Sequence, residues 1–271
     1  TGEAKSCATE KELDTILAEL EDRGLVGWDI RVNRYDLHPI VRGVVWNELD
    51  AQKQIDIYND LSFYFDAVPK QYWTEVRSLE DLTPAFELFN ALIGLKLFDD
   101  AILVFRDYLR EATLYRLAAA QQRIELLERF YPNGIESLPL LTNTDAQSYA
   151  LNELAMTYHL CGRLERALHL YKFSAQIREE RKELLDVSLI NCNIAESLRL
   201  SGNLYEAQVR IGYALKFGRD DVRAQIFAEY MRGIIMATLG DAVKSEIPMR
   251  RANAIATKSK MSQGEGLIRS Y

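Results

Sequence analysis

The chain has 271 residues, of which 48% are hydrophobic and 27% are charged, with 6 prolines and 14 glycines. This balance is ordinary for a soluble globular protein and excludes wholesale disorder. The net charge of -7 argues against a nucleic-acid-binding surface that covers the molecule.

Cysteine usage and hydropathy both predict a cytoplasmic protein. The three cysteines, Cys7, Cys161 and Cys192, include no CxxC pair, and such a sparse, odd count is typical of a reducing compartment. No apolar run is long enough to span a bilayer, and no signal-peptide pattern precedes the first helix. Because the chain begins at Thr1 rather than at a methionine, we expect it to be a piece of a longer protein.

The N-terminal segment predicts a helix, a two-stranded hairpin and a second helix. Apolar residues recur at helical spacing over residues 12–23, and Gly24 ends this run. The β-favouring segment over residues 25–37 breaks around Asn33, as a hairpin does at its turn. Pro39 then occupies a position that the first turn of a helix accepts. A segment of about 50 residues buries little core by itself, so it must lean on the helices that follow.

From residue 51 onward the periodicity predicts helices only. Residues 51–145 form a helical linker, which includes a degenerate helical hairpin over residues 82–115. In this hairpin Ala101 occupies the small position, and Lys96 stands where a turn glycine is expected. The stretch "YPNG" and the loop after it mark the point beyond which the sequence begins to repeat.

The rest of the chain, residues 146–271, carries one pattern three times, at about 148–185, 188–222 and 226–258. Glycines at positions 162, 202 and 240 mark the turn of each copy. Small residues let the two helices of a hairpin cross closely, and large apolar residues bury the face that the next copy covers. The small positions are Ala155, Ala195 and Gly233 in the first helices, and Ala167, Ala207 and Ser245 in the second helices.

This pattern resembles the tetratricopeptide repeat, in a longer form of 38 to 40 residues. The alternative is an irregular helical bundle, which does not account for matched positions in three consecutive copies. The predicted fold is therefore all-α: a tetratricopeptide-like α-α superhelix preceded by a small partial winged helix with one β-hairpin. We assign residues 1–50 to the C-terminal half of that winged helix, and the linker and the repeats follow it.

The stretch "LEDRGLVGWDIRVNRYDLHPIVRGVV", residues 20–45, resembles the end of the winged helix in signal-transduction ATPases with numerous domains. These are regulatory ATPases of the NB-ARC (STAND) type, and bacterial members carry tetratricopeptide tails like the one predicted here. The resemblance implies that the histidine of an apolar-His motif, here Leu37-His38, contacts the phosphates of bound ADP and holds the resting state. Pro39 stands where many members have aspartate, so the contacts of that acid are lost or made differently.

His38 therefore has two interpretations. The resemblance makes it a cofactor-binding residue, a contact to ADP in the full-length parent, where a helix N-terminus also favours an anion. The alternative is a helix-capping or core histidine. This chain has no Gly-Lys dipeptide and hence no Walker A loop, so we expect no cofactor in it and ATP or ADP only in the parent. If the first interpretation holds, His38 faces outward, with Leu37 and Ile40 as apolar anchors on the inner side.

Motifs of catalysis are missing from the sequence. HExxH, GxSxG, GxGxxG and CxxC are all absent, and no metal site is expected. Paired acids such as Asp99-Asp100 and Glu179-Glu180 have the pattern of solvated helix faces rather than of an acid-base pair. We therefore predict that the chain is not an enzyme and has no catalytic residue.

A tetratricopeptide array instead offers a concave groove lined by the first helix of each hairpin. Amide, charged and aromatic groups on this face suit a peptide, a protein segment or a polar small ligand. The alternative for each of them is plain solvent exposure. The predicted groove residues are Tyr149, Asn152, Glu153, Met156, His159, Asn193, Glu196, Arg199, Phe227 and Tyr230, and the same faces also carry Leu189, Cys192, Met231 and Ile234.

These patterns leave three hypotheses for function. The first is a non-catalytic sensor region of a STAND-type NTPase, which binds a trigger in the groove and signals through the winged helix to a nucleotide-binding domain outside this chain. The second is a free-standing tetratricopeptide scaffold or adaptor. The third is the regulatory region of a transcription activator. In each case the expected partner is a protein or peptide, or a small ligand, and neither a nucleic acid nor a membrane.

Overall fold

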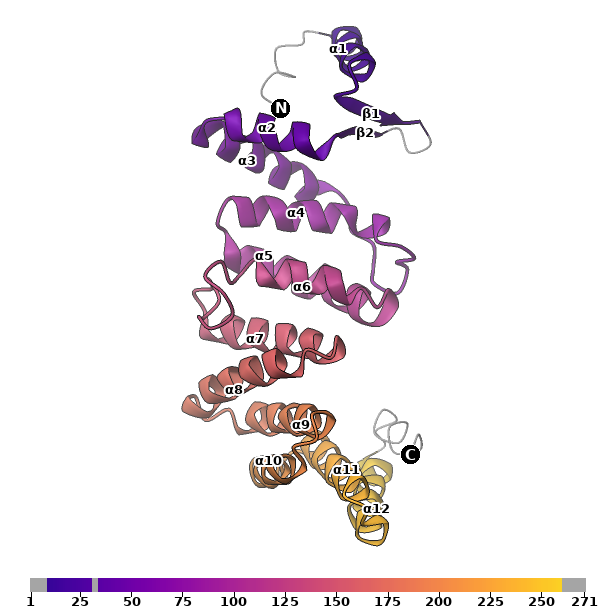
Figure 1. Cartoon of the computed structure of the whole chain (residues 1–271), viewed down its shortest axis with the longest axis vertical. Coiled ribbons are helices and arrows are strands. Elements are labelled where there is room, and N and C mark those ends of the chain that lie inside the picture. The colour runs from indigo at the N-terminus through magenta and orange to yellow at the C-terminus, as the bar shows by residue number, and fades with distance from the viewer. Residues whose placement is uncertain (1–8, 31–33, 260–271) are drawn as a thin grey trace. The chain divides into compact units, whose positions relative to one another are not determined.

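The computed structural model describes residues 9–30 and 34–259 of the chain. Within these residues it consists of helices and one two-stranded β-hairpin (Figure 1). Over the described residues, the prediction of an all-α fold of tetratricopeptide-like hairpins with a single β-hairpin is confirmed. The chain divides into two compact units, and the division falls between Leu109 and Arg110. None of the described helices is both long enough and apolar enough to cross a bilayer.

The first unit begins with the predicted helix and hairpin. Helix α1 (Glu10–Asp22) starts at a capping box, in which Thr9 and Glu12 each accept a hydrogen bond from the other's backbone N–H. Strands β1 (Val26–Asp29) and β2 (Arg34–Leu37) then pair antiparallel, with Val26 opposite Leu37. The rings of Trp28 and Tyr35 stack across the two strands with their centroids 5.9 Å apart.

Helices α2 (Pro39–Glu48) and α3 (Ala51–Ala67) follow the hairpin, and this segment buries few side chains. Neither α1 nor α3 contains a buried residue. The expectation that Leu37 and Ile40 are apolar anchors is wrong, because within the described residues their side chains are 36% and 71% exposed. Elements this short have too little apolar surface to form a core of their own.

The core of the first unit lies between α4 (Thr83–Gly94), α5 (Phe98–Val104) and the π-helical turn η3 (Phe105–Leu109), after the short η2 (Glu80–Leu82). Phe89 and Phe105 are completely buried there. The ring of Tyr58 on α3 covers the α-carbon of Gly94, since a β-carbon at that position would lie 2.3 Å from the ring. A larger residue at position 94 would therefore have to displace the ring of Tyr58 where α3 crosses α4.

The turn between α4 and α5 places Lys96 where the sequence predicted a turn glycine. The backbone of Lys96 has φ of +60°, in the left-handed region, and glycine occupies the equivalent turns of the second unit. A side chain with a β-carbon costs about 1 kcal/mol or more in this conformation.

We expect Lys96→Gly to raise the free energy of unfolding by about 0.5–1 kcal/mol, because glycine removes the strain and the added freedom of the unfolded chain offsets part of the gain. Urea unfolding followed by circular dichroism measures the change. Lys96→Ala is the matched control and should give no gain, because alanine keeps the β-carbon. Equal stabilisation by both variants would show that loss of the lysine charge is responsible.

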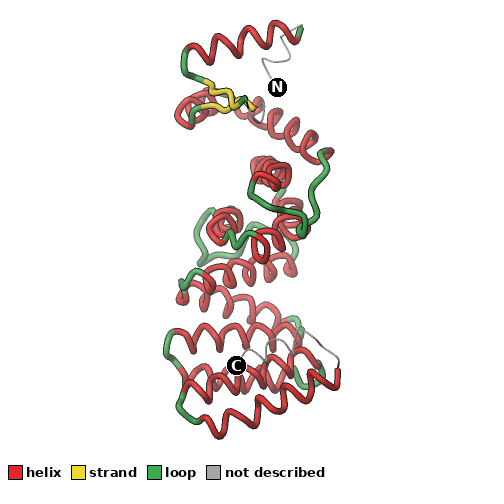
Figure 2. Tube along the Cα trace, turned by 90° about the vertical axis from the view of Figure 1, so that its right-hand side faces the viewer, coloured by secondary structure: helices red, strands yellow, loops and turns green. Residues whose placement is uncertain are grey.

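The second unit is a series of helical hairpins (Figure 2). The π-helical turn η4 (Ala112–Arg116) and α6 (Ala120–Glu128) come first, and the loop after α6 leads into the repeats. Three helix pairs then follow: α7 (Thr144–Leu160) with α8 (Leu164–Glu180), α9 (Leu184–Leu200) with α10 (Leu204–Phe217), and α11 (Val222–Thr238) with α12 (Ala242–Ser259). Gly162, Gly202 and Gly240 turn each pair with φ of +72°, +82° and +86°.

The small residues lie at the helix crossings, as their spacing indicates. Ala155, Ala167, Ala195 and Ala207 have no exposed surface, and Gly233 is buried against Met249, whose Cγ would lie 2.7 Å from a β-carbon at that glycine. Ser245 differs, because it is only half-buried and its hydroxyl donates to the carbonyl oxygen of Ala242 at 2.6 Å.

The two compact units do not follow the predicted domains, whose boundaries stood after residues 50 and 145. Helix α3 joins the first unit because it packs against α4. Helix α6 joins the second unit because it packs against α7, where Arg123 reaches Glu153. Tertiary contacts thus divide the predicted linker between its two neighbours.

Candidate functional site

The predicted groove residues of α7 and α9 include a group that lines one cavity of the second unit. This cavity has a volume of about 290 Å³. Its predicted members are Tyr149 and Asn152 on α7 and Leu189 and Asn193 on α9. The oxygen Oδ1 of Asn152 is buried and accepts no hydrogen bond from the described residues. A cavity that combines apolar side chains with a few hydrogen-bonding groups is typical of a binding site for a polar ligand such as a peptide.

Sequence reasoning missed the polar residues that complete this cavity. Ser148 on α7 and Ser174 on α8 share a hydrogen bond of 2.8 Å between their hydroxyls, and both are buried. Arg178 donates from Nε to the hydroxyl of Ser148 at 2.8 Å. The prediction placed the groove on the first helix of each hairpin, whereas Ser174 and Arg178 lie on α8, the second helix of its hairpin. The pattern of the first helices contains no information about these two residues.

An ion network holds Arg178 at the edge of the cavity. Its Nη1 lies 2.9 Å from Oδ1 of Asp145 and 3.4 Å from Oδ2 of Asp186, and it also contacts the carboxylate of Glu183. Arg181 bonds Asp145 and Glu183 as well. Hydrogen bonds from Arg178 and then Arg181 lower the pKa of Glu183. Two cations thus face three carboxylates, so this edge carries a net charge of -1.

The groove residues near the C-terminal ends of α7 and α9 lie outside that cavity, and one of their hydrogen bonds joins the two helices. The Nδ1 of His159 lies 2.8 Å from the hydroxyl of Ser197, and burial lowers the pKa of His159. Arg199 donates to both carboxylate oxygens of Glu196, at 2.7 and 2.8 Å. Met156, which lies between Asn152 and His159 along α7, is half-buried.

Two predicted groove residues are buried, and their assignment to an open groove is wrong. Glu153 is 2% exposed and its carboxylate bonds Arg123 and Arg110 inside the second unit. Tyr230 is 7% exposed on α11, because this helix packs against α9 and α10 as well as its partner α12. Phe227 on the same helix stays exposed. Of the other residues projected onto these faces, those that are also buried are Cys192, Met231 and Ile234.

His38 lies at the N-terminus of α2, in the first unit, and its side chain is exposed. Its Nδ1 accepts a hydrogen bond from the backbone N–H of Ile40 at 3.3 Å, so it caps the helix. A core histidine is therefore excluded. The capping interpretation has a direct contact in its favour, and an ADP contact in a longer parent remains a proposal.

The described residues contain no group of three or more histidine, cysteine, aspartate or glutamate side chains that could hold a metal ion. Cys192 is buried, and burial raises the pKa of its thiol to about 12. Its sulfur therefore stays protonated at neutral pH and packs as a small apolar side chain.

Comparisons with known proteins give only distant structural matches. No protein-family model matches the chain, and no curated protein matches it. The nearly identical TPR-like repeats of a Podosopora anserina protein, described as a kinesin light chain, are 14% identical, with a TM-score of 0.45 over 78% of this chain and 90% of theirs. A variant of the same repeats with one substituted residue is 12% identical, with a TM-score of 0.41 over 78% and 89%. BtubC (BKLC) from P. vanneervenii is 17% identical, with a TM-score of 0.30 over 79% and 94%.

The chain's own helix pairs, glycine turns and buried small residues define its class. It is a helical-hairpin repeat protein of the tetratricopeptide-like kind.

Proposed function

We propose that the chain is a non-catalytic protein-interaction scaffold that binds an extended peptide or protein segment in the groove of its first helices. The observation that carries this proposal is the cavity between α7 and α9, where the amides of Asn152 and Asn193 converge and Oδ1 of Asn152 has no hydrogen-bond partner among the described residues. A carboxamide offers both a donor and an acceptor, as a peptide backbone requires. The net negative edge around Arg178 favours a segment without acidic residues at that end.

Selection from a displayed library of random 12-residue peptides tests this proposal. Peptides selected on the full chain should bind with micromolar affinity, and the double variant Asn152→Ala, Asn193→Ala should weaken them about tenfold through two lost hydrogen bonds. Asn253→Ala is the matched control, because Asn253 is exposed on α12 and lies outside the groove. Peptides that bind wild type, the double variant and the control equally would place the binding surface elsewhere.

A second candidate is the sensor region of a STAND-type regulatory NTPase, in which the same groove binds a trigger. The observation in its favour is the helix, hairpin and helix at the start of the chain, with His38 exposed at the N-terminus of α2. A nucleotide-binding domain would be the intramolecular partner and would supply ATP or ADP. The coding sequence upstream of residue 1 decides between the candidates, since the sensor requires a Walker A loop there and the scaffold does not.

A further inference from the structure

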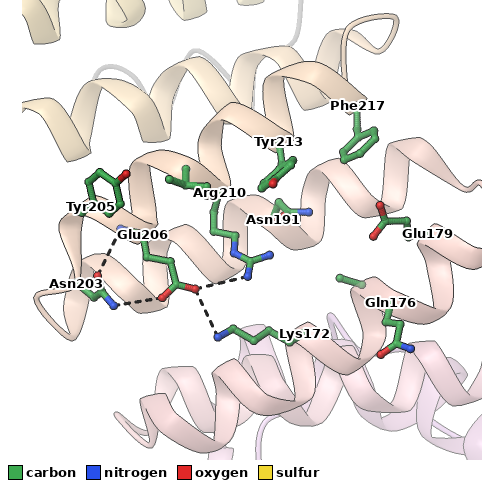
Figure 3. A pocket seen from close by; sticks show the side chains of 12 residues that line it. Lys172, Gln176, Glu179, Asn191, Asn203, Tyr205, Glu206, Arg210, Tyr213 and Phe217 are labelled. Atoms are coloured by element: carbon green, nitrogen blue, oxygen red, sulfur yellow. Dashed lines mark hydrogen bonds and ion pairs between the residues drawn. The ribbon is translucent and has the colours of Figure 1, made fainter.

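A larger pocket lies on a different face of the second unit, between the second helices α8 and α10 (Figure 3). Its volume is about 790 Å³, within the usual range for ligand sites. It contains none of the predicted groove residues and shares no residue with the cavity between α7 and α9. The pocket and the groove cavity therefore have separate linings.

The floor of the pocket is Asn191 of α9, which is 3% exposed. Its Nδ2 donates to the carbonyl oxygen of Val187 at 2.8 Å, and this bond fixes which way the amide points. The other amide atom, Oδ1, is buried and has no hydrogen-bond partner among the described residues. A buried acceptor without a donor is costly, so the pocket is suited to a ligand that supplies an N–H.

Arg210 of α10 places a donor in the same pocket. Its Nη2 lies 3.5 Å from Oε1 of Glu206, whereas its Nε is buried and, within the described part of the chain, makes no hydrogen bond. One open acceptor and one open donor in a single pocket complement a peptide unit, which has one N–H and one carbonyl oxygen. The polar atoms of the pocket thus favour a peptide backbone over a ligand of a single polarity.

The charges of the pocket differ between its two ends. Glu206 is neutralised at one end, where Lys172 and Arg210 both lie 3.5 Å from its carboxylate and Asn203 donates to it at 3.2 Å. Glu179 lies toward the other end (Figure 3), and no described residue forms an ion pair or hydrogen bond with its carboxylate. An acidic ligand would compete with Glu206 for its two cations, whereas a basic ligand would find Glu179 open.

Aromatic rings form the wall at the Glu179 end. The rings of Tyr213 and Phe217 are stacked, with centroids 6.3 Å apart and planes within 13° of each other. The ring of Phe217 already makes a cation–π contact within the chain, because Nζ of Lys216 lies 5.5 Å from its centroid. Tyr213 is half-exposed, so its ring is the surface on which a ligand's cation can stack.

We propose that this pocket binds an extended peptide segment through one arginine: its guanidinium bonds Glu179 and stacks on Tyr213, while its backbone meets Asn191 and Arg210. The planar guanidinium can bond a carboxylate through two N–H groups and stack on a ring at the same time, which an ammonium cannot do. The peptide N–H donates to Oδ1 of Asn191, and a peptide carbonyl accepts from Nε of Arg210. This site is additional to the groove and does not depend on it.

Methyl NMR of the full chain with the capped peptide acetyl-Gly-Ser-Arg-Ser-Gly-amide tests the proposal. Ala175 and Val209 line this pocket and Leu189 lines the groove cavity, so their methyl groups report the two sites separately. We expect saturable shifts at Ala175 and Val209, and binding at least about threefold weaker when lysine replaces the arginine. A glutamate peptide should bind weaker still. Shifts confined to Leu189 would overturn the proposal and leave the groove function intact.

Two wall substitutions with a matched control identify the contacts. Glu179→Gln should weaken the arginine peptide about fivefold, and Tyr213→Ala by a similar factor. Glu180→Gln removes the same charge one residue away and outside the pocket, so it should leave affinity unchanged. Glu179→Lys should reverse the preference between arginine and glutamate peptides. If the Glu179→Gln and Glu180→Gln variants weakened binding equally, the attraction would come from long-range charge alone, and the proposed contact with Glu179 would be wrong.

Discussion

Glu153→Gln is expected to lower the free energy of unfolding of the chain by about 3–5 kcal/mol, because it leaves a buried arginine without its carboxylate. Arg123 is 1% exposed, and its Nη2 lies 2.8 Å from Oε2 of Glu153. The other carboxylate oxygen accepts from Nε of Arg110 at 2.9 Å. Glutamine keeps the shape of the side chain and one acceptor but presents an NH2 donor to one of the two arginines, so the loss combines the uncompensated charge with one lost acceptor.

Arg123 makes three further hydrogen bonds in this buried site. It donates to the carbonyl oxygen of Arg110 at 2.9 Å, and to the hydroxyls of Thr113 and Thr157 at 3.2 Å each. No water can replace the lost carboxylate at such a burial. The network joins η4, α6 and α7, so its failure would loosen the start of the repeats.

Chemical denaturation of three variants separates this effect from ordinary polar loss. Glu196→Gln is the matched control, because Glu196 pairs with Arg199 at a partly exposed site, and we expect it to cost less than about 1 kcal/mol. The double variant Arg123→Leu, Glu153→Gln should be more stable than Glu153→Gln alone, since it removes the unpaired charge. A double variant no more stable than Glu153→Gln alone would contradict an uncompensated arginine as the cause.

Ala207→Leu is expected to destabilise the chain by about 1–3 kcal/mol, because the larger side chain overpacks a helix crossing. Ala207 has no exposed surface and lies on α10, which packs closely against α9. Ala167 occupies the same position in the preceding hairpin and is equally buried, so Ala167→Leu should behave alike. Thermal unfolding followed by circular dichroism gives the change in midpoint.

Ala254→Leu serves as the control for helix propensity and added apolar surface. Ala254 is exposed on α12, and leucine and alanine are both strong helix formers, so its midpoint should stay close to that of the wild type. If Ala207→Leu also left the midpoint unchanged, the crossing would have room that the buried alanine does not indicate, and the repeat alignment would need another register.

Local pattern was enough to predict the hairpins. The glycines at 162, 202 and 240 adopt left-handed backbone, and even Lys96 does so at the turn position where a glycine was expected. The β-hairpin lies within residues 25–37, where β-favouring residues and a break coincide. Turns and hydrophobic periodicity depend on neighbours close in sequence, which is why single-sequence reasoning captures them.

The candidate site was predicted only in part, because burial depends on contacts between distant elements. Asn152 and Asn193 do share a cavity, but Glu153, one residue beyond Asn152, turns toward Arg123 on α6. A helical projection places both residues near the groove, since it contains no information about what α6 covers. Tyr230 is lost from the groove for the same reason, as α11 packs against three other helices.

Sequence pattern was sufficient to predict the helical class, the hairpin repeat with its glycine turns and small crossing residues, and the β-hairpin near the start of the chain, because each follows from short-range periodicity and backbone preference. Three outcomes required the folded structure: Arg123 and Glu153 form a buried ion pair, Arg178 of a second helix closes the groove cavity, and Asn191 is the floor of a pocket between α8 and α10. These outcomes depend on which helix faces cover one another, and that is set by packing between separate helices, such as the contact of Arg123 with Glu153 across 30 residues, rather than along one turn.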